Sequence, residues 1–242
     1  MPQIHQKDQN FYDNMWEECN DMIYYSPAPR IRRQKIISWT KNLAIDSLLD
    51  VGCGNGEFLL QVHKARPDLR LAGADLSQAI IKKNSIKLPM MDFFTLDLDS
   101  ETISRKFDGV VCMEVIEHCA DYRDAIKRLA EMTNKWLFIT VPAGPIYEID
   151  RRVGHTKHFT AGEISSAIEQ AGLKMLKLQM WGFPFFNLYK RAINVNPDAM
   201  CESFLSSKGY GAKEKIIASA TYAAFKLSLP WLGNQVFAVA SR

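Results

Sequence analysis

The sequence predicts an α/β fold built on a doubly wound, parallel sheet. Short apolar runs with the character of buried strands alternate with stretches of helical periodicity, and short links join them. The apolar runs are continuous, as expected for parallel strands that helices cover on both faces. A turn rich in glycine follows the first run directly. These three observations together indicate an open α/β sheet.

The expected elements follow in order along the chain. A helix over 31–43 leads into the first strand, which begins at residue 47, and the glycine-rich turn passes into a helix near residue 58. Thr160 and Glu163 have the spacing of a capping box at the start of another helix. Further helices are expected over 76–83, 121–132, 160–171 and 213–227, and further strands over 69–74, 91–96, 108–113, 136–141, 173–180 and 235–240.

A chain of 242 residues can bury one core, and we expect a single domain over 1–242. Residues 45–181 and 233–242 are expected to form this core. Residues 1–44 form an N-terminal helical segment, whose aromatic residues either pack on the core or close as a lid over a pocket. Residues 182–232 form an insertion, because the last two strands are joined by far more chain than a hairpin requires.

Composition argues against several classes of protein. The formal net charge of +3 is too small to indicate nucleic acid as a partner. The five cysteines show no Cys-x-x-Cys spacing, so neither a disulfide framework nor a zinc site is expected. No apolar run approaches the ~20 residues of a membrane span, and no signal peptide pattern is seen. We therefore expect a soluble, cytoplasmic protein.

The glycine-rich turn contains Gly52, Gly54 and Gly56. A dinucleotide fingerprint requires its third glycine one residue later, at the position that Glu57 occupies, so the spacing argues against an NAD enzyme. No Gly-Lys-Ser/Thr follows, which excludes a phosphate-binding P-loop. Glycines let the backbone approach a ligand closely, and the N-terminus of the following helix offers N–H groups to an anion. The turn is expected to hold the anionic end of a ligand.

Residues 50–56, Asp-Val-Gly-Cys-Gly-Asn-Gly, closely resemble motif I of the class I S-adenosylmethionine-dependent methyltransferases. The resemblance implies a seven-stranded Rossmann-like sheet with the last strand antiparallel, and S-adenosyl-L-methionine as the cofactor. It also implies that this motif holds the methionine end of the cofactor. The residues assigned to that role are Asp50, Gly52, Cys53, Gly54 and Gly56.

Two acidic residues at strand ends extend the resemblance. Asp75 lies about twenty residues beyond the glycine turn, where the family has an acidic residue that binds both ribose hydroxyls, and Leu76 follows it. Asp97 matches the acidic residue that accepts from the adenine amino group, with a backbone contact from Leu98. Asp99 competes for this role, and a helix cap is the alternative for each carboxylate.

Residues 107–118 resemble the fourth-strand motif of small-molecule methyltransferases, including quinone O-methyltransferases. The resemblance places Met113 and Glu114 along the cofactor, and Glu117 and His118 at the edge of the active site. A structural role for Glu117 and His118 is equally open. The motif lacks the leading histidine of a zinc-peptidase helix, so that interpretation is rejected.

Residues 154–160 resemble a Gly-His-x-x-x-Phe-Thr turn that occurs in one broad group of these enzymes. His155 lies beyond the fifth strand and is a candidate general base, because an ordinary histidine titrates near neutrality. A satisfied structural turn is the alternative. Metal binding by His155 and His158 requires a third ligand that the sequence does not identify, so no metal is expected.

These observations favour a methyltransferase that moves a methyl group to a small molecule by direct in-line displacement. Oxygen is the expected acceptor atom, with nitrogen and carbon as alternatives. Acceptor specificity is assigned to the N-terminal segment and to the acceptor-side insertion 182–232, whose aromatic residues permit a lipophilic acceptor or weak peripheral contact with a membrane. Core packing is the favoured role for the apolar positions of the 213–227 helix. A methyltransferase for RNA or protein and a non-catalytic cofactor-binding module are the alternatives.

Overall fold

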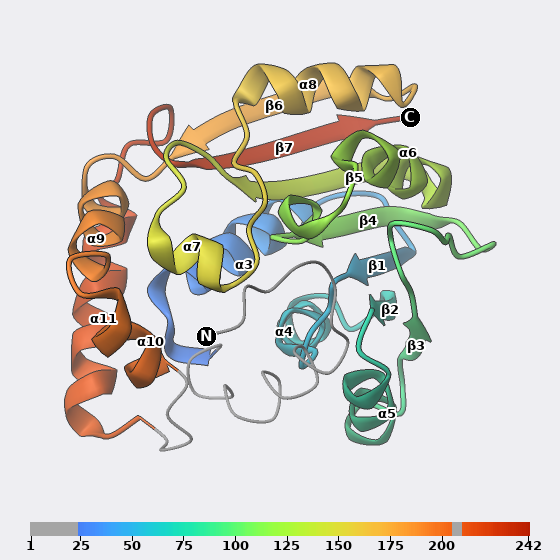
Figure 1. Ribbon diagram of the computed structural model, residues 1–242. Helices are drawn as coiled ribbons and strands as arrows, with labels where there is room; N and C mark the ends of the chain where they lie inside the picture. The colour runs from blue at the N-terminus through green and yellow to red at the C-terminus, as the bar shows by residue number, and fades with distance from the viewer. Residues whose placement is uncertain (1–23, 205–209) are drawn as a thin grey trace.

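The computed structural model describes residues 24–204 and 210–242, together with the side chains of 24–200 and 210–242. Seven strands form one sheet in the order β3-β2-β1-β4-β5-β7-β6 (Figure 1). The strands are β1 (Ser47–Val51), β2 (Arg70–Asp75), β3 (Asp92–Thr95), β4 (Phe107–Met113), β5 (Thr133–Pro142), β6 (Lys174–Trp181) and β7 (Gln235–Ser241). β7 runs antiparallel to the other six strands, which all point in the same direction. The predicted fold class is confirmed.

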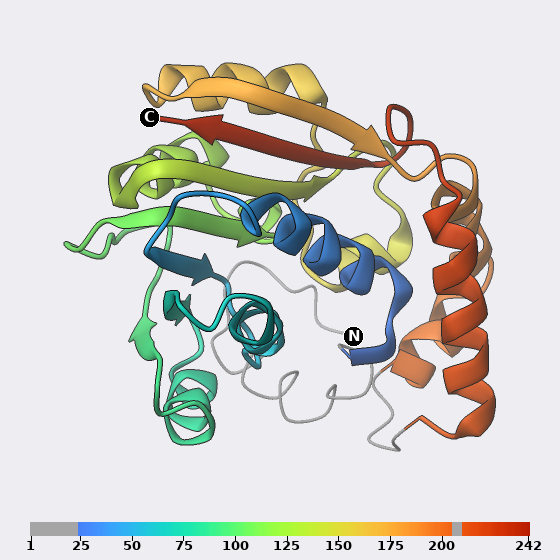
Figure 2. The same ribbon diagram turned by 180° about the vertical axis from the view of Figure 1, so that it is seen from behind.

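The helices lie on both faces of the sheet (Figures 1 and 2). On one face lie α3 (Pro27–Thr40), α4 (Glu57–Ala65) and α5 (Gln78–Lys87), and on the other lie α6 (Tyr122–Met132) and α8 (Ala161–Gln170). Each face has its own cluster of buried apolar residues, and strand side chains contribute alternately to both. This double coverage explains why the strand sequences are continuous apolar runs.

Helix ends follow the local sequence. The expected capping box forms, with the Thr160 hydroxyl accepting from the Glu163 N–H and the Glu163 carboxylate accepting from the Thr160 N–H. The first described helix begins four residues earlier than expected, since Pro27 occupies the first turn, where a missing N–H has no consequence. Residues 1–23, which include most of the proposed lid, lie outside the described part of the chain.

In its described residues, the insertion between β6 and β7 contains three helices, α9 (Phe185–Ile193), α10 (Pro197–Phe204) and α11 (Ala212–Lys226). The apolar positions of the last of these helices were predicted to pack in the core. This prediction is wrong for Ile216, Ile217 and Leu227, which are exposed. Phe225 and Tyr222 face the core instead. The helix is therefore rotated relative to the expectation. Among the described helices none is both long and apolar enough to cross a membrane.

An aromatic cluster anchors the insertion to the sheet. The fully buried ring of Phe225 lies 5.5 Å from Phe186, 5.3 Å from Tyr189 and 5.9 Å from Trp181, centroid to centroid. Edge-to-face contacts of this kind add to the gain from burying the rings. The position of α11 therefore depends on Phe225.

We predict that Phe225→Ala lowers the free energy of unfolding by about 3–5 kcal/mol, because it removes a buried ring and leaves a cavity. Leu227→Ala removes an exposed side chain from the end of the same helix and should change stability by about 0.5 kcal/mol or less. Urea denaturation of the two variants checks this difference. Equal stability of both variants would contradict the anchoring role of Phe225.

Candidate functional site

A cavity of about 320 Å³ opens beyond the carboxyl ends of β1, β2 and β4. Ligands of open α/β sheets bind at this edge. Side chains from α3 and from the loops after the strands complete its walls. Of the residues predicted from the sequence, ten line the cavity: Asp50, Gly52, Cys53, Asp75, Leu76, Asp97, Leu98, Met113, Glu114 and His118. Gly54, Gly56, Glu117 and His155 lie outside the lining.

The glycine turn is held against the end of β2. The N–H groups of Gly52 and Cys53 both donate to the Ala74 carbonyl, at 2.8 and 3.0 Å. Gly52 has a φ of 77°, and a Cβ at this position would lie 2.2 Å from a methyl carbon of Val115. No larger residue can keep this path, so the turn forms a backbone cradle that a side chain would fill.

Asp75 connects the glycine turn to the start of α5. Its buried carboxylate accepts from the Gly54 N–H at 2.9 Å and from the Ser77 N–H at 3.0 Å. Ser77, and not Asp75, is the N-cap of α5, because its hydroxyl accepts from the Ile80 N–H. Asp75 also lines the cavity, so its carboxylate lies at the surface that a ligand would contact.

A buried carboxylate and a buried arginine lie together in the cavity wall. One oxygen of Asp50 has no hydrogen-bond partner among the described residues, and burial raises the pKa of this carboxyl well above its usual range. The neighbouring Asp75 raises this pKa further, whereas Arg33 lowers it. Burial also lowers the pKa of Arg33 to about 10. An unsatisfied buried oxygen at a cavity surface marks a contact point for a ligand donor.

Glu114 is the only described residue other than glycine with a positive φ, at 57°. Its carboxylate accepts from the Thr140 hydroxyl at 2.9 Å and from the Gln235 side-chain amide at 2.8 Å. Arg32 forms an ion pair with the other oxygen at 3.4 Å. Strained backbone of this kind persists where the surroundings fix it. Sequence reasoning missed Arg32 and Gln235.

The two carboxylates after β3 take different positions. Asp97 lines the cavity and also accepts from the Asp99 N–H at 3.0 Å, in a turn that no helix follows, so the capping alternative is wrong for Asp97. Asp99 is absent from the lining and accepts instead from the Ala120 N–H. The geometry therefore favours Asp97 over Asp99 for a contact with a ligand.

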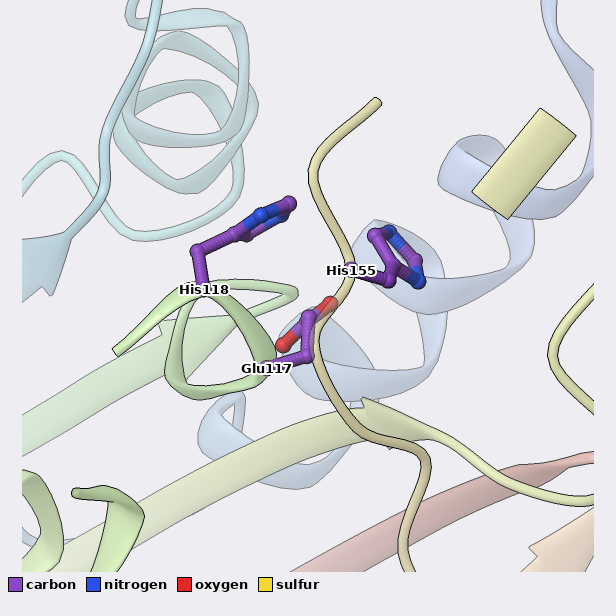
Figure 3. A group of neighbouring side chains, drawn as sticks. All are labelled: Glu117, His118 and His155. Atoms are coloured by element: carbon purple, nitrogen blue, oxygen red, sulfur yellow. The ribbon is translucent and has the colours of Figure 1, made fainter. Parts of the chain in front are cut away.

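Glu117 and His118 lie on a short 3₁₀ helix, η1 (Ile116–His118), and His155 approaches them from the loop after α7 (Glu148–Arg152) (Figure 3). One ligand atom of each side chain lies within 4.8 Å of the others. Glu117 is fully buried, and neither carboxylate oxygen has a hydrogen-bond partner among the described residues. Burial raises the pKa of Glu117 well above its usual range, and the Glu114 carboxylate raises it further.

Hydrogen bonds fix which ring nitrogen carries the proton in this group. Nδ1 of His118 lies 3.1 Å from the Gly154 carbonyl, which can only accept. In a neutral His118 the proton is therefore on Nδ1, and Nε2 is unprotonated. In the same way Nδ1 of His158 donates to the Gly144 carbonyl at 3.2 Å. The bare Nε2 of a neutral His158 then accepts from Nδ1 of His155 at 3.0 Å, which leaves Nε2 of His155 unprotonated.

Burial keeps these histidines neutral. It lowers the pKa of His118, and it lowers the pKa of His155 to about 2, with His118 and His158 adding to the shift. Burial also lowers the pKa of His158, and Lys190 contributes. The group therefore presents unprotonated ring nitrogens at neutral pH. A general base is most effective when its pKa lies near the operating pH, so a pKa of about 2 disfavours His155 as the base and leaves His118 as the candidate.

Asp150 on α7 is a further residue that sequence reasoning missed. It forms an ion pair with Lys190 of α9 at 3.1 Å and lies 3.8 Å from Nε2 of His158. Asp150, His155 and His158 form one group that could hold a metal ion, and Glu117, His118 and His155 form another. The sequence-based argument against a metal was the lack of a third ligand, and this argument is wrong. The absence of a metal stays a prediction.

The fold and the cavity define an α/β domain that binds a ligand at the carboxyl edge of a parallel sheet. The family model described as a methyltransferase domain matches residues 25–178, which is more than half of the chain. The chain belongs to the methyltransferase domain family. The predictions of a class I methyltransferase and of S-adenosylmethionine as the cofactor are confirmed at the level of the family.

Two solved structures share the fold across almost the whole chain. The [4+2]-cyclase SpnF is 15% identical with a TM-score of 0.67, covering 99% of this chain and 97% of that one. The N-methyltransferase NodS from Bradyrhizobium japonicum, solved with S-adenosyl-L-homocysteine, is 15% identical with a TM-score of 0.62, covering 98% and 99%. A fold shared by a cyclase and a methyltransferase does not specify the reaction.

Among curated proteins, the ubiquinone biosynthesis O-methyltransferase of Coxiella burnetii is 31% identical over 122 residues, which are 45% of this chain and 51% of that protein. The chain thus spans about half the length of this relative. The match supports membership of the family. It does not identify the acceptor of this chain.

The neutral state of His155 has a consequence for stability. An unfolded histidine titrates near 6.5, whereas folding lowers the pKa of His155 to about 2. Below about pH 6.5 the unfolded chain therefore binds a proton that the folded chain excludes, and the free energy of unfolding falls as the pH is lowered. A single histidine contributes a slope of at most about 1.4 kcal/mol per pH unit.

We predict that His155→Gln makes this acid loss of stability shallower. Urea denaturation at several pH values between about 7 and 5 measures the slope. His63→Gln, on the outer part of α4, should keep the slope of the unmodified protein. An unchanged slope in His155→Gln would mean that His155 is protonated in the folded state.

Proposed function

We propose that the chain is an S-adenosylmethionine-dependent methyltransferase acting on a small-molecule acceptor, with oxygen as the expected acceptor atom. The observation that carries this proposal is one cavity lined by the glycine turn, by Asp75 and by Asp97. A backbone cradle followed by two carboxylates at successive strand ends fits a ligand with a charged amino-acid end, a ribose and an adenine. The bound cofactor supplies a methyl group on a sulfonium, already activated for displacement.

The residues of this chain bind and orient the cofactor. The free oxygen of Asp50 lies where an ammonium group can donate to it, and Arg33 beside it supplies a positive charge for a carboxylate. Gly52, Gly54 and Gly56 allow close approach of the backbone. Asp75 accepts from ribose hydroxyls.

The remaining predicted cofactor contacts lie farther along the cavity. Asp97 accepts from the adenine amino group, and Leu98 supplies a backbone contact. Met113 and Glu114 line the wall between the two ends. Alignment of donor and acceptor, together with exclusion of water, accounts for most of the rate enhancement that such a displacement needs.

His118 is the residue that we assign to the acceptor. It lines the cavity, and its proton on Nδ1 is held by the Gly154 carbonyl, so Nε2 can take a proton from an acceptor hydroxyl. His155 and Glu117 lie behind it and are assigned to support and proton transfer. The Coxiella burnetii relative is an O-methyltransferase of ubiquinone biosynthesis, which supports an oxygen acceptor of lipophilic character.

We predict that S-adenosylhomocysteine binds to the protein in isothermal titration calorimetry and that Asp75→Ala weakens this binding at least tenfold. Asp75→Ala removes the ribose acceptor and also releases the Gly54 N–H. Asp92→Ala, which removes an exposed carboxylate from the start of β3, is the matched control and should bind normally. A flat titration with the unmodified protein would overturn the proposed function.

A second prediction concerns the histidines. His118→Gln and His155→Gln should each keep their affinity for S-adenosylhomocysteine while turnover falls at least tenfold, because general base catalysis typically contributes about 10²–10⁴. Transfer of label from S-adenosylmethionine to the components of a cell extract measures turnover, and His63→Gln is the control. Label in polymer instead of small molecules would favour the RNA or protein alternative. Unchanged turnover in His155→Gln would assign that residue to structure.

A further inference from the structure

Exposed apolar side chains gather on the insertion. Nine of the fifteen large apolar side chains that are exposed in the described part of the chain lie between residues 183 and 232, about a fifth of the sequence. Scattered single exposures are ordinary, whereas a concentration on one element indicates an interaction surface. These nine are Phe183, Phe185, Leu188, Val195, Ile216, Ile217, Leu227, Trp231 and Leu232.

One part of this surface is a stripe along α11, which lies at the outer edge of the molecule in both views (Figures 1 and 2). Ile216, Ala220 and Leu227 are exposed at helical spacing, on the side away from the buried Tyr222 and Phe225. Small and apolar residues thus face solvent over most of the helix. This arrangement is the reverse of a helix that buries its apolar stripe.

The second part lies where α9 begins and α11 ends. The Phe183 N–H donates to the Leu232 carbonyl at 3.0 Å, and the Leu229 N–H donates to the Phe183 carbonyl at 2.7 Å. These bonds bring the loop that carries Trp231 beside the start of α9, where Phe185 is exposed. The stripe ends at Leu227, four residues before Trp231. We call the stripe, the start of α9 and the loop that carries Trp231 the insertion face.

The insertion face has a basic border. Residues 182–232 contain six lysines and arginines against three acidic residues. One of the six, Lys190, is buried and paired with Asp150, so the other five supply the positive charge of this segment. Lys213 and Lys226 at the two ends of α11 and Arg191 on α9 are exposed. Two copies meeting through this face would bring like charges together, whereas an anionic surface complements them.

We propose that the insertion face docks on the surface of an anionic phospholipid bilayer. Its parts are those of an interfacial element: an apolar stripe that enters the boundary between headgroups and chains, lysines that extend to the phosphates, and an exposed tryptophan at one end. The proposal does not depend on the proposed function, because docking requires no turnover.

The topology connects the insertion face to the cavity. The insertion leaves the sheet after Trp181 and returns at Gln235, both at the carboxyl edge, and the Gln235 amide bonds Glu114 in the cavity wall. Docking therefore brings this edge of the sheet toward the lipid. If the proposed function holds, a lipophilic acceptor reaches the cavity from the bilayer.

The test is co-sedimentation of the full chain with vesicles of equal parts phosphatidylcholine and phosphatidylglycerol. The double variant Leu227→Ser and Trp231→Ser replaces side chains that are 70% and 69% exposed, and vesicle binding should fall at least tenfold. The matched control, Ile86→Ser and Met90→Ser, replaces side chains that are 83% and 62% exposed at the end of α5 and should bind like the unmodified protein. Circular dichroism checks that each variant is folded.

Four results would overturn the proposal. One is no binding of the unmodified protein, and another is an equal loss in both double variants. A third is binding that is the same on phosphatidylcholine alone, which would remove the role of the basic border. Self-association in light scattering without vesicles, abolished by Leu227→Ser and Trp231→Ser, would assign the face to a second copy instead. The proposal is supported if the unmodified protein binds anionic vesicles at low salt, if added salt weakens this binding, and if Leu227→Ser and Trp231→Ser removes it selectively.

Discussion

The pair of backbone hydrogen bonds from Gly52 and Cys53 to the Ala74 carbonyl is the constraint on which the site depends. These bonds hold the turn after β1 against the end of β2 and thereby fix the start of α4. They are made by backbone groups, so the sequence requirement is the absence of a side chain at Gly52. Asp75 adds a third bond to the turn through Gly54, and the same carboxylate faces the cavity. Under the proposed function, structural bracing and ligand recognition share one residue.

The parts of the structure that follow from short stretches of sequence were predictable. Continuous apolar runs identified the strands, and the spacing of Gly52, Gly54 and Gly56 located the cradle before any geometry was known. Arg32 and Gln235 were not predictable, because both act on Glu114, which is far away in the chain. The Gln235 amide reaches Glu114 across 121 positions, and no local pattern encodes such a pairing. The predicted orientation of α11 was wrong for a related reason. Helical spacing indicates that an apolar stripe exists, but it does not indicate whether the stripe faces the core or the solvent.

Two kinds of electrostatic environment meet at the cavity. Near the glycine turn, Asp50 and Arg33 are both buried, and Arg33 offsets part of the rise in the pKa of Asp50. Near η1, burial leaves His118 and His155 uncharged, and the Glu117 carboxyl has a raised pKa. The first environment suits an ionic group that must be held, and the second suits a proton that must move. The sheet places both within one cavity edge by ending β1 and β4 side by side.

The strained backbone at Glu114 has a consequence for the order in which the molecule is completed. Its carboxylate is paired by Arg32 from α3, by Thr140 from β5 and by Gln235 from β7. During synthesis on a ribosome, the first two partners emerge long before the third. Until β7 inserts between β5 and β6, Glu114 in the cavity wall of a nascent chain lacks one of its three partners. Pairing of β7 therefore closes the sheet and completes the support of Glu114 in the same late step of folding.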